Sequence, residues 1–259
     1  MYEELFDWSA LTLFLYITAR MSGFVLMNPL FGRRNLPGFF RAGFALVLSV
    51  FVYSITDQTA VMPRGLAEMA VRLLLELGLG FALGMVMEFF FYIPQLAGQV
   101  VDTQMGMTMS QIYDAGSQSN MSVTGTLLNT LMILLFFAAG GHHTLLRLLV
   151  TSGQIVPFGA AGFGQEVASA ALEFFIEATV LAVKLGMPIL AAELMGQLGM
   201  GVLMKVIPQI NIFAINIDLK VLIGLILLLV LISPISEYLV SMEAGMLDSL
   251  HTILTLTAT

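Results

Sequence analysis

Long apolar stretches separated by short polar segments dominate the chain. None of the stretches alternates between polar and apolar positions, so the pattern predicts helices rather than strands. We predict seven helical units: 8–27, 39–55, 63–93 with a stop at Pro94, a polar unit over 95–111, 123–150, 165–204 with a kink at Pro188, and 217–254 with an interruption at Pro234. Because about 20 residues cross a bilayer core, we expect the third, sixth and seventh units to tilt, kink or extend beyond it.

The composition places these helices in a membrane. The 259 residues are 58% hydrophobic and only 10% charged, whereas soluble domains carry about 25% charged residues. We therefore predict an all-α fold class, a polytopic helical membrane protein with long kinked helices and helical hairpins, and a single domain over residues 1–259. The absence of cysteine excludes disulfides and thiolate chemistry. The start, MYEELFDWSA, lacks the basic region and cleavage site of a signal peptide, so we expect the first apolar stretch to be retained.

The most unusual part of the chain is a polar segment over about 98–121, which begins GQVVDTQMGMTMSQIYDAGSQSN and contains no lysine or arginine. Polar groups at membrane depth persist only where protein or a water-filled cavity covers them. A lipid-facing segment therefore cannot hold the glutamines and aspartates found here, which are Gln99, Asp102, Gln104, Gln111 and Asp114. We expect this segment to line or close an internal passage.

Methionines are concentrated in the same segment. Met105, Met107 and Met109 alternate around Gly106, and residues two apart diverge on a helix, so they do not form one helical stripe. Thioether side chains are flexible and fill irregular gaps. A cluster of them can seal a pore and deform around varied cargo, although ordinary apolar packing explains the composition equally well.

A second polar interruption follows the sixth unit. Pro208 breaks the helical pattern, and Gln209 and Asn211 need hydrogen-bond partners. A simple connecting loop is one interpretation, but apolar residues such as Phe213 favour burial. The residues predicted to line the pore or contact other subunits are Gln99, Asp102, Gln104, Pro208, Gln209, Asn211 and Phe213.

Charged residues also occur inside the apolar stretches. Glu68, Arg72 and Glu76 are spaced four apart, so they share one helix face and can form buried charge pairs. A lone charge at the bilayer centre costs at least about 2.5–3.5 kcal/mol on insertion scales. The pattern favours a chain buried against other subunits, and the alternative is that the charged groups reach the membrane surface near helix ends.

The distribution of basic residues gives a partial topology. By the positive-inside rule, Arg33, Arg34 and Arg41 place the first connection inside, and Lys205 and Lys220 place a later one there. The acidic amino terminus and acidic tail are expected outside, which six crossings satisfy. The same count puts the base-free polar segment inside, so simple bilayer-crossing hairpins do not explain the whole pattern.

Two small-residue motifs indicate close helix contacts. They are Gly80-x-x-x-Gly84 and Ala192-x-x-x-Gly196. Packing within the chain and packing between subunits remain equally good interpretations of both.

Enzyme motifs are missing. The chain has no H-E-x-x-H, G-x-S-x-G or P-loop pattern. Tyr113-Asp114 resembles half of an aspartyl intramembrane protease pair, but no second motif supplies the other carboxylate. The neighbours His142 and His143 point apart on a helix and make a poor metal site. We therefore predict no catalytic residues, no metal and no cofactor, and no basic tract suits nucleic acid.

Three ordered sets of residues across the chain resemble the FliR family of flagellar export-gate subunits, called SctT in injectisomes. The first set is Arg20, Gly23, Pro29, Pro37 and Arg41; the second is Gly98-Gln99, Asp102, Gln104-Met105-Gly106 and Tyr113-Asp114; the third is Pro188, Glu193, Gly196, Gly199, Lys205, Pro208-Gln209, Asn211, Phe213 and Leu219-Lys220. The chain departs from the family pattern at Ala115, Lys205 and Asn216, where proline, arginine and glycine are usual.

The resemblance implies a hetero-oligomeric, helical export gate in the bacterial cytoplasmic membrane, within the flagellar basal body. It implies FliP, FliQ and FlhB as protein partners, unfolded flagellar proteins as cargo, and no catalytic activity. It also implies that the middle segment plugs the channel. The residues expected to form this plug and gasket are Met105, Gly106, Met107, Met109, Ile112, Tyr113, Asp114 and Gly116.

Three alternatives stay open from the sequence. The same resemblance covers the equivalent subunit of a virulence injectisome. A secondary transporter with broken helices would also use Pro94, Pro188 and Pro234, although no internal repeat is visible. An intramembrane enzyme is disfavoured by the missing motifs.

Overall fold

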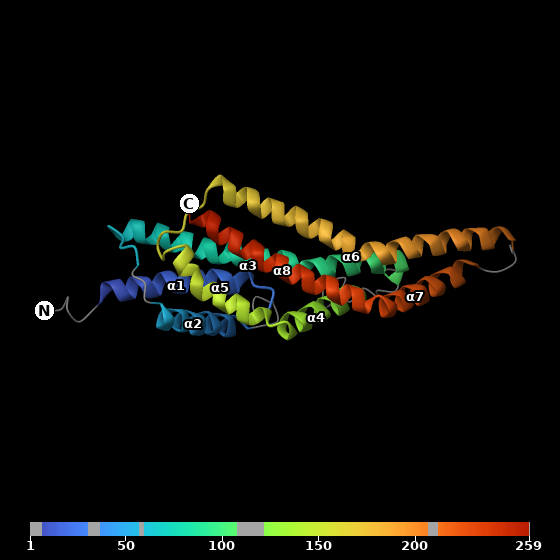
Figure 1. Ribbon diagram of the computed structural model, residues 1–259, viewed down its shortest axis with the longest axis horizontal. Coiled ribbons are helices and arrows are strands. Elements are labelled where there is room, and N and C mark those ends of the chain that lie inside the picture. Colours follow the sequence, from blue (N-terminus) through green and yellow to red (C-terminus); the bar gives the residue numbers. More distant parts are fainter. Residues whose placement is uncertain (1–6, 31–36, 57–59, 108–121, 207–211, 259) are drawn as a thin grey trace. The chain divides into compact units, whose positions relative to one another are not determined.

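The computed structural model describes residues 7–30, 37–56, 60–107, 122–206 and 212–258 (Figure 1). Within these ranges every regular element is a helix, which confirms the predicted all-α class. The helices are α1 (Trp8–Met27), α2 (Gly38–Ile55), α3 (Leu66–Met105), α4 (Val123–Ala138), α5 (Gly141–Ile155), α6 (Gln165–Val206), α7 (Ile212–Val230) and α8 (Ile232–Thr257).

Helix α3 is longer than the sequence pattern predicts. It continues through Pro94 to Met105, so the predicted stop at Pro94 and the separate polar unit over 95–111 are wrong. Proline removes one backbone hydrogen bond, but helices of membrane proteins tolerate this when their neighbours keep the helix packed. Phe91, Ile93 and Ala97 around the proline are all buried, which keeps the helix in place.

Two predicted units are each divided into two helices. The unit over 123–150 breaks at Gly140, whose φ of +79° is a left-handed conformation that favours glycine, so α4 ends and α5 begins there. The last unit breaks at Leu231, where α7 and α8 meet at 62°. Pro234 explains this break because it has no N–H to donate to the Val230 carbonyl four residues earlier.

The chain forms two compact units. Unit 1 comprises residues 1–90, 140–176 and 243–259, and unit 2 comprises residues 91–139 and 177–242. Helices α3, α6 and α8 each contribute to both units, so one domain over the whole chain stays a prediction.

Unit 1 is built on a close crossing of α1 and α3. A Cβ on Gly80 would lie 1.9 Å from the Arg20 carbonyl oxygen, and one on Gly23 would lie 2.1 Å from the Leu77 carbonyl oxygen. Gly84 is similarly close to the Phe24 carbonyl oxygen, at 2.8 Å. The Gly80-x-x-x-Gly84 motif therefore serves packing inside the chain.

Unit 2 contains the C-terminal part of α3 from Phe91 onward, with α4, α7 and parts of α6 and α8. Phe91 of α3 packs edge-to-face against Phe136 of α4, with ring centres 5.5 Å apart. Helices α6 and α7 run side by side in this unit (Figure 1), and Gly196 faces Ile223 across them.

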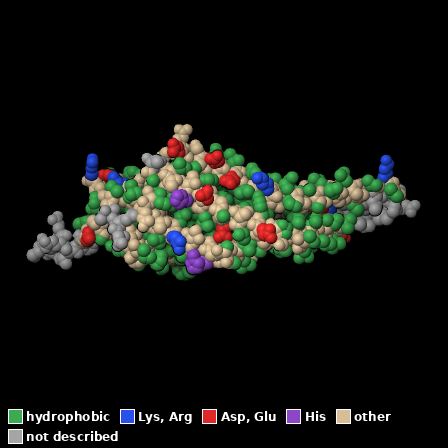
Figure 2. All heavy atoms as spheres, in the orientation of Figure 1, with side chains coloured by type: hydrophobic (Ala, Val, Ile, Leu, Met, Phe, Trp, Pro, Cys, Tyr) green, Lys and Arg blue, Asp and Glu red, His purple; other side chains and the backbone are tan. Residues whose placement is uncertain are grey.

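Among the described residues, four helices, α1, α2, α3 and α6, are long and apolar enough to cross a membrane, and up to six spans result if each bent pair counts as one. Figure 2 shows hydrophobic side chains over most of the visible face. Exposed large apolar residues on α6 and α7 include Leu194, Met195, Leu198, Leu229 and Val230. A surface this apolar is typical of a protein covered by lipid or by other subunits.

Candidate functional site

The base of the polar segment is a buried junction between α3 and α4. Asp102, on the last turns of α3, is fully buried and accepts hydrogen bonds from the Ser122 hydroxyl at 2.7 Å and the Thr124 amide at 3.2 Å. Ser122 is the N-cap of α4, and its hydroxyl oxygen accepts a bond from the Gly125 amide at 2.9 Å. A carboxylate is favourable at a helix N-terminus, where unpaired amides and the helix dipole attract negative charge.

Two glycines let the helices meet at this junction. A Cβ on Gly98 would lie 2.1 Å from the Gly125 amide nitrogen, and a Cβ on Gly125 would lie 2.8 Å from the Gln95 carbonyl oxygen. Both obstacles are backbone atoms, which cannot rotate away as a side chain can. The chain therefore enters the polar segment at α3 and leaves it at α4 from one tightly closed point.

Met105 and Gly106 end α3 next to this junction. Gly106 has a φ of +76°, and its amide donates to the Thr103 carbonyl at 3.2 Å, an arrangement typical of a glycine that terminates a helix. The Met105 side chain is fully buried against Gly224 of α7, where a Cβ would lie 2.6 Å from the methionine methyl carbon. The structure thus gives Met105 a packing role at the base of the segment, and its role in a gasket stays a prediction.

The structure describes only some of the remaining predicted plug and pore residues. Gln99 is exposed on α3, while Gln104 and Met107 are half-buried near its end. Phe213 lies in the first turn of α7, with a side chain outside the described set. Eight further predicted residues lie outside the described ranges: Met109, Ile112, Tyr113, Asp114, Gly116, Pro208, Gln209 and Asn211.

The three charged residues predicted to pair with one another on α3 belong to two separate ion pairs. Glu68 and Arg72 form an ion pair at 2.6 Å, with both side chains partly exposed. Glu76 does not complete this stripe as expected. It pairs instead with Arg20 of α1 at 2.7 Å, and both side chains are fully buried.

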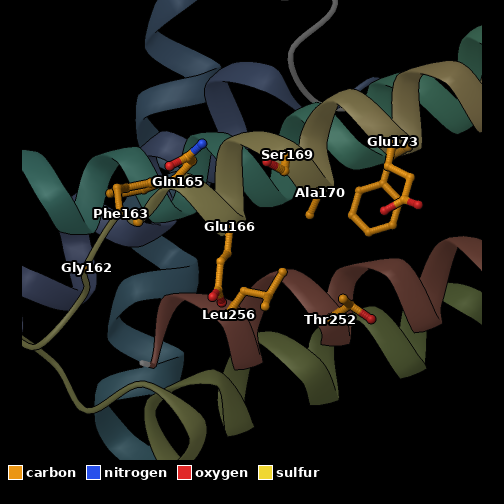
Figure 3. Close-up of a pocket in the computed structure, with 11 residues that line it drawn as sticks. Gly162, Phe163, Gln165, Glu166, Ser169, Ala170, Glu173, Thr252 and Leu256 are labelled. Atoms are coloured by element: carbon orange, nitrogen blue, oxygen red, sulfur yellow. The ribbon is translucent and has the colours of Figure 1, made fainter.

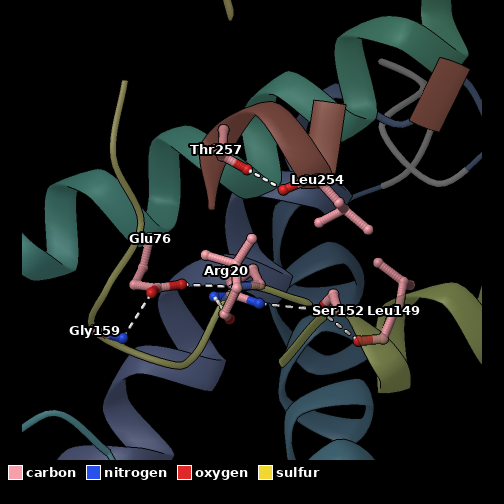
Figure 4. Close-up of polar contacts among 8 residues, drawn as sticks. Arg20, Glu76, Leu149, Ser152, Gly159, Leu254 and Thr257 are labelled. Carbon is pink, nitrogen blue, oxygen red and sulfur yellow. Dashed lines mark hydrogen bonds and ion pairs between the residues drawn. The ribbon is translucent and has the colours of Figure 1, made fainter. Parts of the chain in front are cut away.

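Arg20 is the centre of a buried polar network in unit 1 (Figure 4). Its guanidinium donates to the Ser152 hydroxyl at 3.1 Å and to the Val156 carbonyl at 3.0 Å, and it lies over the Phe158 ring at 4.4 Å. Glu76 accepts a bond from the Gly159 amide at 2.7 Å. The network joins α1, α3, α5 and the chain after α5, and sequence reasoning missed this pairing even though Arg20 stands in the middle of an apolar stretch.

A cleft with a volume of about 1030 Å³ lies in unit 1 (Figure 3). Glu166 and Glu173 of α6 face it, and Thr252 and Leu256 of α8 form the opposite wall. No lining residue is a histidine, lysine or arginine, and no group of acidic or histidine residues in the described ranges is arranged to hold a metal.

Comparison with known proteins identifies the class. The family described as bacterial export proteins, family 1, matches residues 11–244, and the chain belongs to this family. It is 28% identical over 86% of both chains to the flagellar biosynthetic protein FliR of Bacillus subtilis, and 27% identical over 92% of both to that of Escherichia coli. It is also 27% identical over 89% of both chains to the Yop proteins translocation protein T of Yersinia pestis. These matches confirm the predicted resemblance, and the chain is an export component rather than an enzyme.

We expect the Asp102→Ala substitution to lower the free energy of unfolding by about 1–3 kcal/mol, because it leaves the buried Ser122 hydroxyl and Thr124 amide without their acceptor. Denaturation of the purified chain in mixed micelles would measure this. Gln99→Ala is the matched control, since Gln99 is exposed one turn earlier on the same helix. Equal effects of the two substitutions would contradict a stabilising junction.

Proposed function

We propose that this chain is a subunit of the bacterial flagellar type III protein export gate. In this proposal it forms part of the channel through which unfolded flagellar proteins cross the cytoplasmic membrane, inside the basal body. FliP and FliQ are the proposed neighbours in the gate, and FlhB is the proposed neighbour at its entrance. Membership of the export family, the FliR relatives and the apolar helices support this assignment.

The observation that carries the plug part of the proposal is the buried Asp102 junction. A plug must move or deform while the wall that holds it stays in place. Asp102, Ser122 and Thr124 fix both ends of the intervening polar segment at one point. The fixed base lets the segment between them change without separating α3 from α4.

In the resting gate, the proposed gasket consists of apolar side chains in the polar segment, with Gly106 and Gly116 as turning points. Unfolded cargo displaces the segment, and the flexible thioethers close around it and limit ion leakage. The gasket side chains are Met105, Met107, Met109, Ile112 and Tyr113.

Deleting residues 107–119 is expected to raise ion leakage through the assembled gate while leaving the amount of assembled complex unchanged. Uptake of a permeant ion by cells or vesicles containing the gate would measure the leak. Replacing the same residues by a glycine–serine sequence of equal length is the control, because it keeps the connection but removes the apolar side chains. Unchanged leakage from both variants would remove the plug from the mechanism.

A virulence injectisome is the second candidate setting. The Yersinia relatives are as similar to this chain as the Escherichia coli flagellar one, at 27% identity each. Complementation of a strain lacking its flagellar subunit distinguishes the two settings, since only a flagellar subunit is expected to restore swimming.

A further inference from the structure

Unit 2 contains an apolar cavity at the point where two helices are interrupted by proline. It has a volume of about 210 Å³ and lies between the part of α6 around Pro188 and the α7–α8 break around Pro234. The cavity is lined by Lys184, Leu185, Pro188, Ile189, Leu231, Pro234, Ile235 and Tyr238. Buried Leu185, Ile189 and Ile235 form its floor, and exposed Lys184 belongs to its rim.

Two polar groups at this cavity lack a partner in the described structure. The Tyr238 hydroxyl is buried and makes no hydrogen bond. A buried donor without a partner costs about 1–3 kcal/mol, so it requires an explanation. Lys184 forms none of the ion pairs found among the described residues, and no acidic residue lines the cavity.

The position of Lys184 suits a membrane surface. Helix α6 has 42 residues, about twice the 20 that cross a bilayer core. Lys184 lies near its midpoint, so the ammonium group falls close to a boundary of the hydrocarbon whichever half of α6 is embedded. Burial at the bilayer centre is disfavoured because of the cost of placing an ammonium group there.

We propose that this cavity binds an anionic phospholipid. One acyl chain enters between α6 and the α7–α8 break and packs on Leu185, Ile189 and Ile235, while the lipid phosphate pairs with Lys184. The Tyr238 hydroxyl donates a hydrogen bond to an oxygen of the lipid head region. Apolar cavities of about 150 Å³ accept a hydrocarbon as large as benzene, so this volume accommodates a chain segment. Basic pockets between membrane helices bind anionic head groups in the same way.

Native mass spectrometry of the full-length chain in mild detergent tests the site, with phosphatidylglycerol and phosphatidylcholine of identical acyl chains as probes. We expect phosphatidylglycerol to be retained about tenfold more strongly, the difference that one charge-assisted contact supplies. Lys184→Gln is expected to abolish this preference. Lys205→Gln is the matched control, because Lys205 is exposed on the same helix but does not line the cavity.

Tyr238→Phe keeps the shape of the cavity and removes only the hydroxyl, so we expect it to weaken retention of both lipids by a factor of about three to ten. Equal retention of the two lipids by the unmodified chain, or equal effects of Lys184→Gln and Lys205→Gln, would overturn the site. The complex purified from its own membranes provides a further test. If it carries no phospholipid that Lys184→Gln removes, a neighbouring subunit occupies the cavity instead and the proposal fails.

Discussion

Replacing Glu76 by glutamine is expected to lower the free energy of unfolding by about 3–5 kcal/mol, because it removes one partner of a fully buried ion pair and leaves the other charged. The Arg20 guanidinium cannot reach water and keeps only neutral partners in Ser152 and Val156. Denaturation of the full chain by sodium dodecyl sulfate in mixed micelles would measure the change.

Glu68→Gln is the matched control for this substitution. Glu68 lies on the same helix and also pairs with an arginine, but both groups are partly exposed, and exposed pairs contribute little to stability. A much smaller effect is therefore expected at Glu68. Joint replacement of Arg20 by methionine and Glu76 by leucine should cost less than the sum of the single changes, since no unpaired charge is left. Similar losses at Glu76 and Glu68 would show that burial of the pair does not matter.

The second large effect is expected at Gly98. Adding the single methyl of alanine places a carbon 2.1 Å from the Gly125 amide nitrogen, so α3 and α4 must separate. Overpacking of this kind costs about 1–3 kcal/mol, and more when the obstacle is backbone. In the proposed gate we also expect Gly98→Ala to cause ion leakage, because a displaced α4 no longer presents Ser122 to Asp102.

Gly199→Ala separates this steric effect from the general consequences of replacing a helical glycine. Gly199 lies in α6, and a Cβ there meets nothing within 4 Å. The substitution is expected to stabilise the helix by up to about 1 kcal/mol. If Gly98→Ala proved as harmless as Gly199→Ala in both unfolding and leakage measurements, the close crossing would not exist in the folded protein.

Much of the helical architecture follows from the apolar pattern because lipid and packing both require long uninterrupted helices. The predicted helix boundaries were wrong at positions where tertiary packing overrode the local conformational preference of a residue. From the sequence, Pro94 predicts the end of a helix. In the structure α3 continues past it, because neighbours such as Phe91 and Ile93 are buried and keep the helix packed. In the sequence nothing distinguishes Gly140 from the other glycines. Its left-handed conformation in the structure is what marks the division between α4 and α5.

The candidate site was predictable in its residue types but not in its contacts. Asp102 stands out as a carboxylate in a base-free segment, yet its partners Ser122 and Thr124 are about 20 positions away and carry no signal of their own. The same limit applies to Glu76. Helical spacing suggests Arg72 as its partner, and only the crossing of α1 over α3 brings Arg20 closer.

The junction formed by Asp102 and Ser122 has a consequence for the length of the connection between α3 and α4. Asp102 and Ser122 lie outside the connection and hold its two ends together, so their hydrogen bond does not depend on the length of the chain between them. Doubling the length of such a connection costs only about 0.6 kcal/mol in closure entropy. A longer connection is therefore compatible with this closed point, as long as the glycine crossing and the Asp102 carboxylate are both kept.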